Sequence, residues 1–159
     1  MNVVEQVDLG AALVESFREV METLFALPYD GPGTGGEPDS PSMTGIIGLA
    51  GPEFRGLLRF SCAEATARRL AGMLLGDEEL AASDPAVADS LGELANILGG
   101  SVKRRIEASG IHLELSLPSV LAGRAQMVNV GASAGAQLNW RIEGKSVETA
   151  LMYNHMRRR

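Results

Sequence analysis

Three polar residues at helical spacing are the part of this chain whose types could do chemistry. Asp89, Glu93 and Asn96 follow one another in steps of four and three residues. A helix turns about 100° per residue, so these steps bring the three side chains to one face. Gly100 and Lys103 continue the face, and we call these five residues the polar row. An acidic, amide-bearing ridge beside a glycine has a shape that can enter another protein's cleft.

The opposite side of the same helix is apolar, which fixes the direction of the polar row. The residues concerned are Val87, Leu91, Leu94, Leu98 and Val102. Because the apolar side must face a core, the polar row must face outward. A solvated helix face is the plain alternative, but two costs count against it. The like charges of Asp89 and Glu93 lie one turn apart, and Gly92, Gly99 and Gly100 each weaken a helix by roughly 1 kcal/mol relative to alanine.

Other common forms of catalysis find little support. His112, His155 and Cys62 do not form a metal-binding pattern. The sequence has no nucleophile elbow and no phosphate-binding loop. Cys62 lies in the stretch Ser61–Glu64, which has the pattern of a helix-capping box, so we interpret it as structural. We therefore expect neither self-contained nucleophilic catalysis nor a metal or other cofactor of this chain's own.

Composition and charge narrow the class of protein. Of 159 residues 45% are hydrophobic, enough for a real core, and only 4% are aromatic, which argues against base stacking. Residues 1–100 carry 16 acids and 5 bases, and residues 101–159 carry 4 acids and 9 bases, so the half with the polar row would repel nucleic acid. The chain shows neither a signal peptide nor an apolar stretch of membrane-spanning length. We expect a cytoplasmic protein that contacts neither nucleic acid nor membrane.

The order of expected elements predicts an α+β fold. A helix over 9–27 is followed by a Pro/Gly-rich loop over 28–42 that we expect to be flexible. Strands over 44–50 and 55–61, helices over about 61–75 and 84–110, and strands over about 111–117, 125–131, 136–142 and 146–153 complete the pattern. This order predicts one domain over 1–156, with a mostly antiparallel sheet packed against long helices, and a basic tail over 157–159.

The run DSLGELANILGGSVKRRIEASGIHLELSLP resembles the signature segment of the CheX/CheC/FliY chemotaxis phosphatases. That family's motif is Asp or Ser, then Glu, Asn and a later proline, here Asp89, Glu93, Asn96 and Pro118. Residues 17–23 and 45–51 also resemble the first helix and first strand of a CheX-like member. One copy of the motif favours CheX over CheC, which carries two. The resemblance implies a CheC-like fold.

The resemblance also implies an activity and a partner. The chain would dephosphorylate the aspartyl phosphate of a CheY-type response regulator, whose active site would supply the Mg²⁺. Asn96 would hold the attacking water in line with phosphorus, and Glu93 would pair with the partner's active-site lysine. Asp89 would be secondary, Gly100 would leave room for a partner loop, and Lys103 would extend the contact surface.

Alternatives remain open at this stage. A regulator-binding module without catalysis could use the same helix face, although binding alone does not require an amide at Asn96. A structural subunit of a motor or pilus assembly is a third possibility. The family resemblance further implies a homodimer joined through the sheet, and the hairpin formed by 136–142 and 146–153 offers an edge for it.

Overall fold

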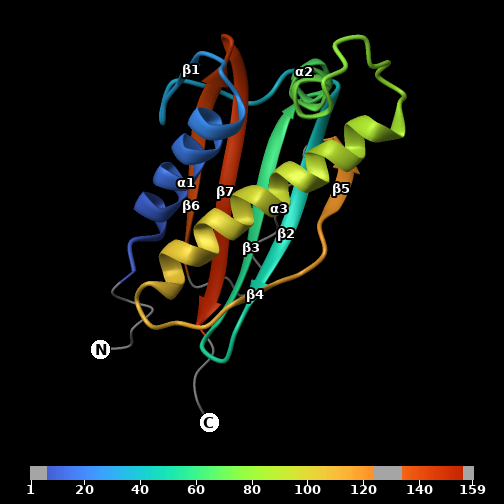
Figure 1. The fold of residues 1–159 in the computed structure, drawn as a ribbon. Coiled ribbons are helices and arrows are strands. Elements are labelled where there is room, and N and C mark those ends of the chain that lie inside the picture. The colour runs from blue at the N-terminus through green and yellow to red at the C-terminus, as the bar shows by residue number, and fades with distance from the viewer. Residues whose placement is uncertain (1–6, 124–133, 156–159) are drawn as a thin grey trace.

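A computed structural model describes residues 7–123 and 134–155 (Figure 1). Three helices and seven strands follow one another within these described residues. Their bounds are α1 Leu9–Leu24, β1 Tyr29–Asp30, β2 Ser42–Ala50, β3 Phe54–Ala63, α2 Glu64–Leu75, α3 Pro85–Glu107, β4 Glu114–Leu115, β5 Ser119–Ala122, β6 Ala134–Ile142 and β7 Lys145–His155. The helices predicted over 9–27, 61–75 and 84–110 are confirmed, and so is the hairpin predicted over 136–142 and 146–153. Their ends shift by a few residues.

The strands form one antiparallel sheet in the order β1-β6-β7-β3-β2-β4, and β5 also pairs with β2. Helices α1 and α3 lie side by side on one face of this sheet, and α3 crosses it diagonally (Figure 1). The short helix α2 lies near one end of the sheet. This arrangement confirms the predicted α+β class with a mostly antiparallel sheet.

Small residues let α3 lie close against the centre of the sheet. A Cβ added to Gly45 on β2 would come within 3.0 Å of the Leu91 carbonyl oxygen of α3. A Cβ on Gly99 of α3 would come within 2.9 Å of Ile47 on β2. Both contacts are tighter than packed side chains normally tolerate, so the two glycines set the depth at which α3 sits. Helix α3 therefore has one fixed orientation over β2.

Helix α1 packs on the other half of the sheet through aromatic rings. Phe17 stacks on Trp140 of β6 with ring centroids 3.9 Å apart. The ring of Phe60 on β3 is nearly parallel to that of Phe17, with centroids 6.5 Å apart. The Trp140 indole Nε1 donates to the Thr149 hydroxyl at 3.0 Å, which satisfies its buried N–H. A chain with few aromatic residues thus concentrates them where α1 meets the sheet.

Three sequence expectations differ from the structure near the strand ends. The predicted strand over 111–117 is reduced to Glu114–Leu115, and a second short strand occupies Ser119–Ala122 where we expected a loop. The capping box over 61–64 is absent, because β3 continues to Ala63 and the Ser61 hydroxyl bonds Thr44 at 2.8 Å. The strand expected over 125–131 lies outside the described residues.

Residues 29–33 of the 28–42 loop lie along β6 in the structure. Tyr29 and Asp30 pair with Ile142 and Arg141, and the Gly33 N–H donates to the Asn139 carbonyl at 2.8 Å. This corrects the expected open edge of the C-terminal hairpin. The outer edge of β6 at residues 139–142 is covered by the chain itself, and β7 lies inside the sheet between β6 and β3. The sequence pattern missed these contacts because a pairing of two residues has no periodicity.

Candidate functional site

Helix α3 begins at a well-formed cap, which fixes the rotation of everything it carries. The Asp84 carboxylate accepts from the Ala86 N–H at 2.9 Å, and Pro85 occupies the first turn, as predicted. The helix then runs for 23 residues without a break. Its predicted apolar side is confirmed, since the residues concerned are all buried: Val87, Leu91, Leu94, Leu98 and Val102.

The polar row lies on the outward side of α3. Asp89 and Glu93 are exposed, and Asn96, Gly100 and Lys103 are half-buried. Within residues 7–123 and 134–155, the side chains of Asp89, Glu93 and Asn96 make no hydrogen bond or ion pair. Lys103 differs, because its Nζ lies 3.8 Å from Glu107 one turn later. The structure therefore presents two uncompensated carboxylates and a free amide on one rigid surface.

The basic residues at the end of α3 are compensated by α1. The Glu19 carboxylate accepts hydrogen bonds from Ser101, from Arg105 at 2.7 Å and from Arg104 at 3.0 Å. The Ser101 and Arg105 hydrogen bonds hold the pKa of Glu19 below its ordinary value. This network ties α1 to the turn that follows Gly100. Sequence reasoning missed it, because the network joins two helices that are separated by three strands and a third helix.

The three glycines in the middle of α3 have different surroundings. Gly99 lies against Ile47 of β2, so its small size serves the protein's own packing. Gly92 faces β5, and a Cβ there would contact Val120 at 3.4 Å and Pro118 at 3.7 Å, which is ordinary packing. A Cβ on Gly100 would have no atom within 4 Å. Among these three, only Gly99 is required by the described packing, and only Gly100 is surrounded by open space.

We expect alanine at the two adjacent glycines to change stability in opposite directions. Gly100→Ala should stabilise the protein by roughly 0.5–1 kcal/mol, because alanine is the better helix former and the added methyl meets open space. Gly99→Ala should destabilise it by roughly 1–3 kcal/mol through the clash with Ile47. Urea denaturation of both variants checks this, and a loss of stability in Gly100→Ala would contradict it.

The motif proline lies next to the polar row. Pro118 is exposed at the start of β5, and β5 packs against Gly92, one residue before Glu93. Two segments that are far apart in sequence therefore form one surface: the outward side of α3 and the 116–120 segment. The sequence motif contains both, although spacing alone does not place them together.

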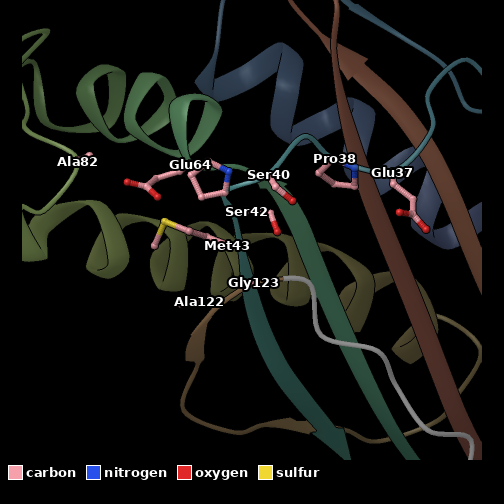
Figure 2. Close-up of a pocket in the computed structure, with 10 residues that line it drawn as sticks. Glu37, Pro38, Ser40, Ser42, Met43, Glu64, Ala82, Ala122 and Gly123 are labelled. Atoms are coloured by element: carbon pink, nitrogen blue, oxygen red, sulfur yellow. The ribbon is translucent and has the colours of Figure 1, made fainter.

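A hollow elsewhere on the molecule has a different character (Figure 2). It measures about 460 Å³ and lies between the start of β2, the start of α2 and the end of β5. Glu64 and Glu37 lie toward its two ends, with Ser40 and Ser42 between them. None of the polar-row residues lines it. The polar row lies on a convex helix face, which suits insertion into a partner better than enclosure of a small ligand.

Other candidate chemistry is absent or inert in the described part of the chain. Burial raises the pKa of the Cys62 thiol to about 12, so it is protonated at neutral pH and does not act as a nucleophile. Within residues 7–123 and 134–155, no three His, Cys, Asp or Glu side chains are grouped so that they could hold a metal ion. In the same residues, no helix is long and apolar enough to cross a membrane.

Comparison with known proteins agrees with this fold. The chain superposes with a TM-score of 0.69 on a CheC-like superfamily protein from Shewanella sp. PV-4, at 21% identity, covering 97% of this chain and 99% of that one. It also superposes with a TM-score of 0.71 on a chain of the CheX–CheY–BeF3–Mg²⁺ complex from Borrelia burgdorferi, at 20% identity, covering 92% and 98%. These matches establish a CheC-like α+β fold.

The sequence defines the family more closely. Residues 43–137 match the family model of the chemotaxis phosphatase CheX. The CheY-P phosphatase CheX of Thermotoga maritima is 28% identical over 116 residues, which cover 71% of this chain and 74% of that protein. The chain belongs to the chemotaxis phosphatase CheX family.

Proposed function

We propose that this protein removes phosphate from the phosphorylated aspartate of a CheY-type receiver domain. The observation that carries the proposal is the outward row of Asp89, Glu93 and Asn96, unpaired within the described residues and held on a rigid helix, in a member of a phosphatase family. The Thermotoga relative, a CheY-P phosphatase, and the Borrelia complex of CheX with CheY support it. Such an encounter would take place in the cytoplasm.

Asn96 would act on water rather than on phosphorus itself. Its amide oxygen can accept a hydrogen bond from water while its NH₂ donates to a phosphate oxygen, and it carries no charge to repel the anion. Water held in line would attack phosphorus, the bond between phosphorus and the aspartyl oxygen would break, and inorganic phosphate would leave. The receiver would recover a free carboxylate, and the receiver would hold the Mg²⁺ that neutralises the phosphate.

Glu93 would orient the complex by pairing with the receiver's active-site lysine. In the free protein its carboxylate is exposed and unpaired among the described residues, so docking would not first break an internal ion pair. Asp89 lies one turn earlier and would contribute attraction at longer range. Gly100 and Lys103 lie one and two turns after Asn96, where open space beside Gly100 would admit a partner loop.

We expect Glu93→Lys to weaken binding of the phosphorylated receiver about ten-fold or more, because a lysine would then face a lysine. Asp30→Lys is the matched control, since it makes the same change in charge at an exposed site on β1, at the far edge of the sheet from β4 and β5. Titration of receiver loaded with beryllofluoride and Mg²⁺ measures both. Equal affinity for Glu93→Lys and wild type, with the fold intact, would remove Glu93 from the interface.

The decisive experiment measures loss of phosphate from a panel of phosphorylated receiver domains, with and without this protein. Faster loss from at least one receiver supports the phosphatase proposal. Binding of a receiver without faster loss would instead favour the alternative, a non-catalytic binding module that uses the same helix face. Because binding alone does not require an amide at Asn96, we prefer the phosphatase function.

We also propose that the protein forms a homodimer by continuing its sheet into a second copy. Support comes from residues 134–138 of β6, part of the C-terminal hairpin, which β1 leaves uncovered. A two-fold axis would make this contact self-complementary. Light scattering over a dilution series should give about twice the chain mass of 16.8 kDa, and a constant mass near 16.8 kDa would refute the dimer.

A further inference from the structure

Leu117 is the most exposed of the large apolar side chains in the described residues. Its relative exposure is 89%, whereas the next most exposed, Leu75, reaches 53%. The alternation of Ile111, Leu113, Leu115 and Leu117 predicts that all four face the core. Ile111 and Leu113 are buried and Leu115 is half-buried, so Leu117 alone departs from the pattern.

A bulge turns Leu117 outward. Leu115 pairs with Leu49 and Ser119 pairs with Ile46, so the three residues 116–118 face only two residues of β2. The extra residue breaks the alternation, and side chains after it change face. Bulges are often found where a protein re-aims a side chain for a function. The exposure of Leu117 is thus built into the register of the sheet.

The backbone at this bulge is held firmly. The Ser116 N–H donates to the Gly48 carbonyl at 2.9 Å, and the Gly48 N–H donates back to the Ser116 hydroxyl at 2.8 Å. The same hydroxyl donates to the Leu117 carbonyl at 2.9 Å. Three hydrogen bonds therefore fix the residues around Leu117, and an apolar side chain on such a support loses little backbone freedom when it binds.

The bulge adjoins the polar row. The atoms nearest to a Cβ placed on Gly92 belong to the side chains of Val120 and Pro118. The 116–120 segment therefore lies against the turn of α3 that presents Glu93. A partner protein that contacts Glu93 and Asn96 would thus also approach the apolar side chains of Leu117 and Pro118. An anionic lipid surface does not fit here, because Asp89 and Glu93 would repel it.

We propose that Leu117 is a contact residue for the receiver domain. It would pack on apolar receiver surface beside the phosphorylation pocket while Glu93 and Asn96 enter the pocket. This inference rests on the proposed phosphatase function and adds a recognition element outside the polar row. Since Leu117 does not reach the reacting atoms, it acts on binding and receiver choice and leaves the chemical step alone.

The test uses the full chain and a receiver that wild type dephosphorylates. Leu117→Ser should raise both KM and the Kd for beryllofluoride-loaded receiver about ten-fold, with kcat changed by less than about two-fold. Leu117→Met should behave like wild type, because it keeps the apolar surface. Leu75→Ser is the matched control, since it removes an exposed leucine from the last turn of α2, and it should leave all three constants unchanged.

Three results would overturn the inference. One is unchanged KM and Kd in Leu117→Ser while wild type is active, which leaves the phosphatase proposal intact. Another is a Leu117→Ser variant whose mass by light scattering differs from that of wild type while its KM is unchanged. This result would assign Leu117 to contact with a second copy. The last is a wild-type protein that accelerates phosphate loss from no receiver, which would remove the proposed function together with this inference.

Discussion

Asn96→Ala should lower dephosphorylation of the best receiver by at least about 100-fold while leaving the fold and the affinity nearly unchanged. The expected fall in rate is this large because the variant loses both the group that positions the water and a hydrogen-bond donor to phosphate. Each of these can contribute a large factor to the rate. The side chain is half-buried and makes no hydrogen bond within the described residues, so its removal leaves no internal partner unsatisfied. Binding of beryllofluoride-loaded receiver should change by less than about three-fold.

A chemical series at this position sharpens the test. Asn96→Asp keeps the shape but replaces the donor with a charge that repels phosphate, so it should be as inactive as Asn96→Ala. Asp89→Asn is the control on the same face and should reduce activity only a few-fold, because Asp89 lies two turns before Asn96 on α3. Dephosphorylation of the receiver by Asn96→Ala at the wild-type rate would disprove a catalytic role for Asn96.

The second large effect concerns stability. Arg59 on β3 and Glu148 on β7 form an ion pair of 2.6 Å, with side-chain exposures of only 6% and 1%. They are diagonal neighbours, since Ser61 pairs with Glu148 and Arg59 pairs with Ala150. Glu148→Ala should cost about 3 kcal/mol in free energy of unfolding, because Arg59 would keep its charge in a place with little access to water.

An exposed ion pair supplies the control. Arg69 and Glu143 lie 2.9 Å apart with exposures of 44% and 38%, so Arg69→Ala should cost far less stability than Glu148→Ala, because water screens the exposed pair. The double variant Arg59→Met, Glu148→Leu should recover much of the loss, since it leaves no buried charge. Denaturant unfolding measures all three. If Glu148→Ala and Arg69→Ala cost the same, the burial of the pair has no energetic consequence.

The parts of the fold that local sequence rules govern were predictable. Asp84, Pro85 and the apolar spacing of α3 fix a helix and its rotation, and the rotation alone makes the polar row face outward. Alternation likewise predicted the hairpin of β6 and β7. The family resemblance added the proposed role of Asn96, because outward polar residues at this spacing are common and their types alone are also consistent with a solvated helix face.

The parts that failed depend on contacts between distant segments. The type and position of Ser61 suit the start of a helix, but its hydroxyl is hydrogen-bonded to Thr44 on the neighbouring strand instead. Leu117 continues a regular alternation, and only the pairing of β4 and β5 with β2 reveals the extra residue. The Glu19 network joins residues more than eighty positions apart. Local periodicity contains no information on such partners.

The packing of Trp140 has a practical consequence for all these measurements. It is the chain's single tryptophan, fully buried, stacked on Phe17 and hydrogen-bonded to Thr149. Its emission therefore reports whether α1 is seated on the sheet, while α3 carries the polar row on a separate helix. Receiver binding should leave this emission almost unchanged, and unfolding should shift it to longer wavelength. The protein thus contains its own spectroscopic standard, by which a variant that is folded but inactive is distinguished from one that has lost its structure.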